Sequence, residues 1–109
     1  MYAGTIKSSL TENHNLFYWL FKNEQKTNAP LVLWLNGGPG SSSMFGLFME
    51  NGPLRVEKNG TGSGDFKIGL PTDGQGSWLD EADLLFLDQP VNTGFSYGDT
   101  YATTMNQIS

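Results

Sequence analysis

The sequence contains no cysteine and only one histidine, His14. Without cysteine the chain can form neither a disulfide framework nor a thiolate metal site. A single histidine cannot build a histidine-rich metal site, and the acidic residues are scattered rather than spaced as a calcium-binding loop. The composition therefore predicts no bound metal and no cofactor.

Basic residues and long apolar runs are also scarce. Six lysines and arginines stand against eleven aspartates and glutamates, for a net charge of -5, and an acidic chain without a basic cluster is a poor candidate for binding nucleic acid. The longest apolar runs, residues 16–21 and 31–35, are too short to span a bilayer. The first residues lack the charged and apolar regions of a signal peptide. We therefore expect no nucleic-acid partner, no membrane segment and no signal peptide in this chain.

The first part of the chain has the pattern of a β-hairpin. Residues 2–10 and 16–21 are aromatic and aliphatic runs, and residues 11–15 between them are turn formers. This arrangement predicts two antiparallel strands. His14 falls in the predicted turn, where we expect a solvated loop residue without a catalytic role.

The middle of the chain indicates a βαβ unit within a single domain of 109 residues. Residues 31–35 form a continuous apolar run, typical of a strand buried on both faces of a sheet. Residues 44–50 have apolar side chains at helical spacing, which predicts a short buried helix whose start Ser41 to Ser43 can cap. After a glycine-rich loop or insertion at 59–76, residues 82–87 predict a second buried strand, so the expected fold class is α/β.

Side chains alternate along the first of these strands, so Trp34 and Asn36 are expected to share one face. The strand then leads into WLNGGPGSSS, residues 34–43. Residues 37–41, here called the glycine loop, have little side chain to shield the backbone, and amides at a helix start attract an anion.

Several interpretations of the glycine loop are open. A phosphate loop is disfavoured, because no lysine follows the glycines. A transient oxyanion fits better, because one oxyanion-hole amide of α/β hydrolases comes from the loop after the third strand. The remaining alternative is that the glycines only make a tight turn between strand and helix.

Three separate motifs resemble the N-terminal part of the serine carboxypeptidases. They are WLNGGPGSSS, the helix end Glu50-Asn51-Gly52-Pro53, and Ser77-Trp78 leading into LFLDQPVNTGFSY at residues 85–97. The resemblance runs along essentially the whole chain. It implies that residues 1–109 are the N-terminal portion of one longer α/β-hydrolase domain, with an antiparallel hairpin leading into a mostly parallel sheet that is incomplete here.

The resemblance also implies roles for particular residues. Gly38 matches the position of an oxyanion-hole amide. Positions that help to hold the free C-terminal carboxylate of a peptide substrate are matched by Trp34, Asn36, Gly37 and Glu50. Phe45 and Met49 could line the pocket beside Glu50 and favour apolar substrate residues. An asparagine amide and a backbone N–H can indeed donate to a carboxylate.

Glu50 raises a chemical question, because two carboxylates repel each other. It would have to be protonated to donate a hydrogen bond to the substrate. Its position at a helix end beside apolar neighbours favours the neutral form. We therefore hypothesise a peptidase that works best at acidic pH.

The segment Gly94-Phe95-Ser96-Tyr97-Gly98 formally matches the nucleophile motif G-x-S-x-G. That motif needs a strand directly before the serine and a helix directly after it, and neither is expected here. Ser96 is therefore predicted to be structural, packing with Phe95 and Tyr97. The family nucleophile belongs to a later Gly-Glu-Ser-Tyr-Ala-Gly that this chain does not contain, so the chain alone is predicted to be inactive, with residues 82–87 as an unpaired, aggregation-prone edge.

The predicted function is a serine-type carboxypeptidase that releases C-terminal amino acids through an acyl-enzyme. The alternatives are an acyltransferase of the same family and a non-catalytic relative or fragment that only binds. Many relatives have a disulfide-forming cysteine where Ser41 stands, so the compartment is not fixed by this chain. Family members are commonly vacuolar, lysosomal or secreted, which is the expectation for the parent protein.

Overall fold

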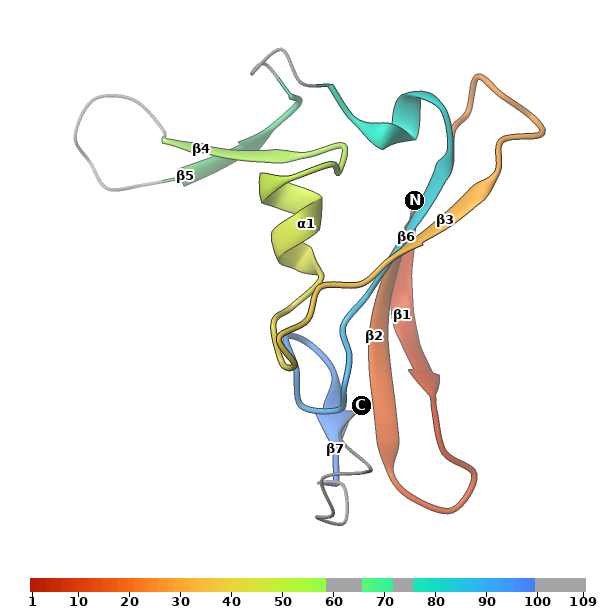
Figure 1. Cartoon of the computed structure of the whole chain (residues 1–109), viewed down its shortest axis with the longest axis vertical. Helices are drawn as coiled ribbons and strands as arrows, with labels where there is room; N and C mark the ends of the chain where they lie inside the picture. Colours follow the sequence, from red (N-terminus) through yellow and green to blue (C-terminus); the bar gives the residue numbers. More distant parts are fainter. Residues whose placement is uncertain (59–65, 72–75, 100–109) are drawn as a thin grey trace.

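The computed structural model describes residues 1–58, 66–71 and 76–99. Its larger sheet has the strand order β1-β2-β6-β3, with a short β7 pairing with the start of β2 (Figure 1). The strands of this sheet are β1 (Tyr2–Lys7), β2 (His14–Phe21), β3 (Leu31–Trp34), β6 (Asp83–Leu87) and β7 (Tyr97–Gly98). The other elements are helix α1 (Met44–Met49), the 3-10 helix η1 (Trp78–Asp80) and a separate two-stranded sheet of β4 (Arg55–Lys58) and β5 (Phe66–Gly69).

The predicted hairpin and the βαβ unit are both confirmed. β1 pairs with β2 in antiparallel register from Tyr2 opposite Leu20 to Lys7 opposite Asn15. β3 and β6 are parallel, with Trp34 opposite Phe86, and α1 lies in the connection between them. The sheet is mixed, since β2 is antiparallel to β6, and the fold class is α/β as expected.

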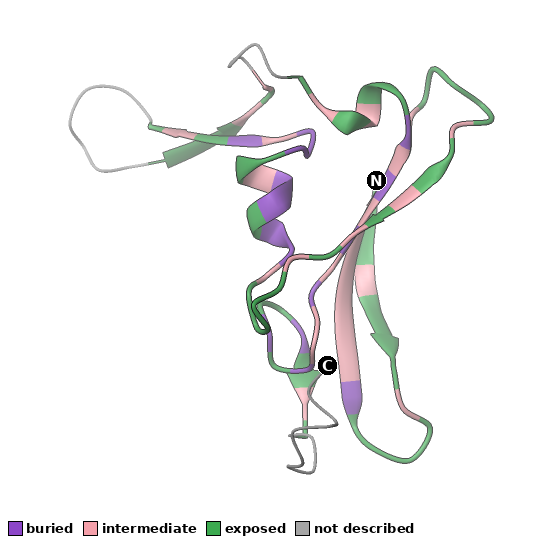
Figure 2. Ribbon diagram, in the orientation of Figure 1, coloured by how far each residue is buried: buried purple, intermediate pink, exposed green. Residues whose placement is uncertain are grey.

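Helix α1 covers one face of the sheet and forms the core with it. Leu47 from the helix and Leu84 and Phe86 from β6 are fully buried (Figure 2). Because β2, β6 and β3 are neighbours, their alternate side chains form one continuous apolar surface under the helix. The buried apolar cluster consists of Phe21, Met44, Leu47, Ala82, Leu84 and Phe86.

The expectation that residues 31–35 are buried on both faces of the sheet is wrong, because the face opposite α1 is exposed. Leu31, Leu33 and Leu35 are 62%, 50% and 49% exposed, because no layer among the described residues lies over that face. The helix is also less buried than predicted, since Phe45 and Met49 are exposed. Both elements therefore bury one side only.

The position of β6 is a second correction. Residues 82–87 were expected to form an unpaired edge, but β6 lies between β2 and β3 and pairs with both. The ends of the main strand order are β1 and β3. Local sequence could not show this, because strand order depends on pairings between distant segments.

His14 is a third correction. It is the first residue of β2 rather than a solvated turn residue, and it is only 3% exposed. β7 returns to this end of β2 and pairs Gly98 with His14, while His14 Nε2 lies 3.3 Å from Glu12 Oε2.

Part of the predicted loop at 59–76 forms strand β5, and the Asn59 glycosylation sequon lies outside the described residues.

Candidate functional site

The candidate site lies where β3 and β6 end and α1 begins (Figure 1). In parallel α/β units the carboxyl ends of the strands are the usual place for ligands. The chain leaves β3 through Leu35 and Asn36, passes through the glycine loop, and enters α1 after Ser43. This is the stretch in which the sequence placed the functional residues.

The side chain of Asn36 is held by three partners. Its Oδ1 accepts hydrogen bonds from Trp34 Nε1 at 2.7 Å and from the backbone N–H of Gly46 at 3.2 Å, and its Nδ2 donates to Glu50 Oε1 at 3.2 Å. Trp34 Nε1 and a backbone N–H can only donate, so the orientation of the amide is settled. Trp34 and Asn36 share a face as predicted, and Nδ2 keeps one N–H for a ligand.

The backbone of Asn36 is also fixed on both sides. Its N–H donates to Ser43 Oγ at 3.0 Å, and its carbonyl accepts from Gln89 Nε2 at 2.8 Å. The Ser43 hydroxyl in turn donates to the carbonyl of Leu87 at the end of β6. Ser43 therefore joins the ends of the two parallel strands, which is why it is fully buried.

The glycine loop itself is exposed. Gly38 and Gly40 have φ values of +143° and +93°, in a region that favours glycine. No atom lies within 4 Å of a Cβ built on Gly37, Gly38 or Gly40. Among the described residues, no acceptor takes the backbone N–H of Gly37 or Gly38, so both amides are available to an incoming anion.

The start of α1 is capped by the predicted serines, but through Ser42 rather than the N-cap residue itself. Ser43 is the N-cap and makes no side-chain capping bond, because its hydroxyl is used between the strands. Ser42 Oγ accepts from the N–H of Met44 at 3.1 Å. Ser42 thus caps the helix, while Ser43 links the ends of the two parallel strands.

Helix α1 carries Phe45 in its first turn, and Met49 and Glu50 lie at its far end. Glu50 is the C-cap and its carboxyl is exposed apart from the contact with Asn36. Phe45 and Met49 are 54% and 60% exposed, so both remain accessible to a ligand. Trp34, which is half-buried, makes an edge-to-face contact with Trp78 at 5.6 Å between ring centroids.

Sequence reasoning missed Arg55, which is buried just after α1. Its guanidinium donates to four carbonyl oxygens: Gly52 at 2.6 Å, Gly76 at 2.9 Å, and Glu50 and Leu54 at 3.1 Å each. Positive charge and donors at a helix C-terminus satisfy its last carbonyls. The only signal in the sequence was a lone arginine two residues after a Gly-Pro helix stop.

Ser96 has a structural environment. It is 5% exposed, its Oγ accepts from the N–H of Phe17 at 2.8 Å, and it donates to the carbonyl of Asp88 at 2.7 Å. The short strand β7, rather than a helix, follows it. Its expected packing partners Phe95 and Tyr97 are largely exposed, and Phe95 contacts Phe17 with ring centroids 5.2 Å apart.

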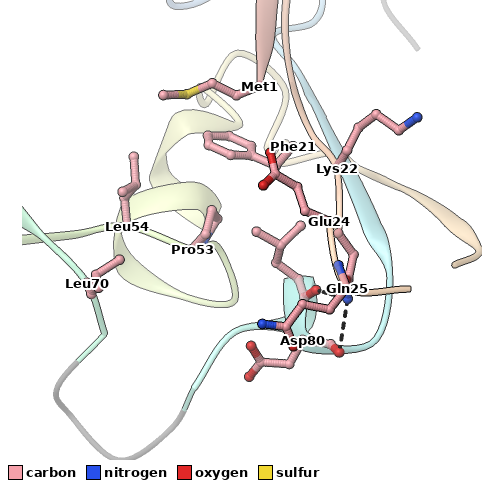
Figure 3. A pocket seen from close by; sticks show the side chains of 11 residues that line it. Met1, Phe21, Lys22, Glu24, Gln25, Pro53, Leu54, Leu70 and Asp80 are labelled. Carbon is pink, nitrogen blue, oxygen red and sulfur yellow. Dashed lines mark hydrogen bonds between the residues drawn. The ribbon is translucent and has the colours of Figure 1, made fainter. Parts of the chain in front are cut away.

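A sizeable cavity lies elsewhere in the structure. Figure 3 shows this space of about 630 Å³, lined by residues that include Phe21, Leu54 and Leu79. Its walls come from the end of β2, the turn before β4 and η1, and it shares no residue with the glycine loop or with Asn36. The described residues contain no cluster of potential metal ligands and no helix long and apolar enough to cross a membrane.

Comparison with known proteins adds a second line of evidence. A family model described as serine carboxypeptidase matches residues 1–108. The pheromone-processing carboxypeptidase KEX1 of Tuber melanosporum is 46% identical over 112 residues, which is 100% of this chain and 16% of that protein. The probable serine carboxypeptidase CPVL of Homo sapiens is 44% identical over 108 residues, which is 97% of this chain and 21% of that protein.

A solved structure agrees with the fold. The crystal structure of KEX1(delta)p, a prohormone-processing carboxypeptidase from Saccharomyces cerevisiae, superposes with a TM-score of 0.70 at 40% identity, over 88% of this chain and 20% of that one. The chain thus spans about a fifth or less of the length of these relatives. With the family model matching almost every residue and relatives at this identity, the chain belongs to the serine carboxypeptidase family.

Proposed function

We propose that the protein containing this chain is a serine carboxypeptidase that releases C-terminal amino acids from peptides through an acyl-enzyme. Residues 1–109 then form the N-terminal portion of a single α/β-hydrolase domain. They supply the oxyanion amide and the groups that hold the substrate carboxylate. The partner is a peptide with a free C-terminus.

The observation that carries this proposal is the environment of Asn36. Its Oδ1 is taken by two donors and one N–H of Nδ2 goes to Glu50, so a single N–H is left for a ligand. A pre-positioned amide donor of this kind suits a carboxylate. Trp34 contributes by orienting Asn36, because its only side-chain N–H is already donated to that residue.

Glu50 completes the carboxylate site if it is protonated. Oε1 accepts from Asn36, which leaves Oε2 as the oxygen that would carry the proton. An O–H at that position donates to a substrate carboxylate, whereas an ionised Glu50 would repel it. Gly37 adds a backbone N–H, and the accessible side chains of Phe45 and Met49 would contact the departing residue.

Gly38 would provide the oxyanion-hole amide. Its N–H has no acceptor among the described residues, and donors kept free for a developing oxyanion are the main source of stabilisation in acyl transfer. Ser96 and His14 are buried in other contacts near β2 and β7. The nucleophile and its base would therefore come from parts of the protein outside residues 1–99.

The first test is the activity of the full-length gene product. We expect it to release free amino acids from N-blocked dipeptides, to lose this activity with a serine-directed fluorophosphonate, and to spare dipeptides whose C-terminus is amidated. Acyl transfer to an added nucleophile in preference to water would instead favour an acyltransferase. Absence of both reactions would leave a binding protein. Membership of this family supports a vacuolar, lysosomal or secreted location for the parent protein.

The role of Glu50 is tested by two variants. Glu50→Gln replaces the proposed O–H with an N–H donor, so we expect product amino acids to bind within a few-fold of wild type. Glu50→Ala should weaken product binding by roughly 10- to 100-fold, because one charge-assisted hydrogen bond is lost. Equal weakening by both variants at acidic pH would reject a protonated Glu50.

A further inference from the structure

We propose that Asp88 is a positioning residue for the oxyanion amide, acting through Ser42 and Ser43, which directly follow the glycine loop. The side chain of Asp88 is fully buried directly after β6. Its Oδ1 accepts from Ser42 Oγ at 2.6 Å and from the N–H of Ser43 at 2.8 Å, and its Oδ2 accepts from the N–H of Phe95 at 3.0 Å. The inference rests on the proposed role of Gly38.

The chemistry of this contact set calls for a carboxylate. All three hydrogen-bond partners of the Asp88 carboxylate donate, and no lysine or arginine among the described residues forms an ion pair with Asp88. Burying a charge is costly unless its oxygens are hydrogen-bonded, and here both oxygens are. An asparagine would turn one oxygen into an N–H facing another donor, so the site distinguishes aspartate from its closest isostere.

The contacts of Asp88 fix one end of the glycine loop. The other end is fixed at Asn36, whose backbone is bound by Ser43 and Gln89. Between these anchors, Gly37, Gly38 and Gly40 meet no atom that would contact an added Cβ. The position of the Gly38 amide is therefore set by its anchors, and Asp88 is the only described residue that binds both Ser42 and Ser43.

Gly94 shows that the surrounding segment is shaped for this contact. A Cβ at Gly94 would lie 2.7 Å from Ser42 Oγ and closer still to Asp88 Oδ2, and its φ of +56° favours glycine. Two motifs that are far apart in the sequence, residues 37–43 and 88–96, thus meet at one buried carboxylate. Residues 88–96 therefore supply the carboxylate that would hold residues 37–43 in place.

The test compares two matched serine variants in the full-length gene product. Ser42 Oγ donates to Asp88 and accepts from the N–H two residues ahead. Ser77 Oγ likewise donates to the carbonyl of Asn51 and accepts from the N–H two residues ahead, at the opposite end of α1. Both serines are half-buried, and Ser42→Ala and Ser77→Ala each remove one donated and one accepted hydrogen bond. Only the bonds of Ser42 lead to the glycine loop.

We expect Ser42→Ala to lower kcat by roughly 10- to 100-fold with KM within about twofold, because small displacements of an oxyanion donor are costly only in the transition state. Asp88→Asn should lower kcat in the same way. Ser77→Ala should also lower the melting temperature, but it should leave kcat within about threefold. Equal losses of kcat in Ser42→Ala and Ser77→Ala, or an unchanged kcat in Ser42→Ala, would overturn the proposal.

A second readout separates this inference from the proposed function. In protein labelled with 15N-glycine, Ser42→Ala should shift and broaden the amide signals of Gly38 and Gly40, while Ser77→Ala should leave them in place. Signals that respond equally to both variants would refute the positioning role. If the wild-type protein proves to have no carboxypeptidase activity, the proposed function fails while these spectra still decide whether Asp88 holds the loop.

Discussion

Replacing Gly46 with alanine tests whether α1 must approach β3 as closely as the carboxylate site requires. Gly46 lies inside the helix and is buried. A Cβ there would lie 2.7 Å from Asn36 Oδ1 and from Trp34 Cδ1, and closer still to Trp34 Nε1. The methyl group would therefore enter the space between the helix and the hydrogen bond that orients Asn36.

The magnitude follows from three opposing effects. Alanine in a helix is favoured over glycine by about 1 kcal/mol. Overpacking a buried position costs about 1–3 kcal/mol, and the two hydrogen bonds to Asn36 Oδ1 contribute about 1 kcal/mol each. The clash and the lost hydrogen bonds outweigh the helix propensity, so we expect Gly46→Ala to destabilise the protein by about 3 kcal/mol.

The assay is a pair of measurements on the full-length gene product: urea unfolding and the affinity for a product amino acid. Gly69→Ala is the matched control, because a Cβ there meets only Glu57 side-chain atoms at 3.8 Å or more. We expect the control to change neither quantity appreciably and Gly46→Ala to lower both. A Gly46→Ala protein that is more stable than wild type and binds product equally well would refute the proposed packing of the site.

Two further predictions concern residues that support the site. Arg55→Met removes four hydrogen bonds to carbonyl oxygens around the end of α1. We expect the free energy of unfolding, measured in urea, to fall by about 3 kcal/mol. A decrease below about 0.5 kcal/mol would contradict the capping role. Ser96→Ala loses contacts to Phe17 and Asp88, so we expect about 2 kcal/mol of destabilisation with undiminished fluorophosphonate labelling. Loss of labelling in Ser96→Ala would instead identify Ser96 as the nucleophile.

The parts of the fold that follow from local pattern could be predicted from the sequence. The two-residue alternation placed Trp34 and Asn36 on one face, and their 2.7 Å hydrogen bond confirms it. The order of strand, helix and strand indicated the parallel pairing of β3 with β6. Both features depend only on periodicity and chain direction over short distances.

The expectations that were wrong concern contacts between segments that are far apart in the sequence. Burial of His14 required β7 to return to β2, and the central place of β6 required β2 to pair with it. The exposed face of Leu33 reflects the absence of a covering layer among the described residues. Asp88 and Arg55 were missed because the role of a lone charged residue depends on its buried hydrogen-bond partners, which the sequence does not show.

The placement of both proposed functions on one short turn would restrict such a site to the C-terminal end of a peptide. Asn36, which would bind the substrate carboxylate, is two residues from Gly38, which would bind the oxyanion, so their Cα atoms are at most about 7 Å apart. Successive carbonyl carbons of a peptide are separated by about 3.5 Å. A carboxylate held at Asn36 and a carbonyl held at Gly38 would therefore be no more than about two residues apart. Because Ser43 and Asp88 fix the turn at its ends, a peptide that continues further would have no carboxylate at Asn36, and such a site would act only at the end of a peptide.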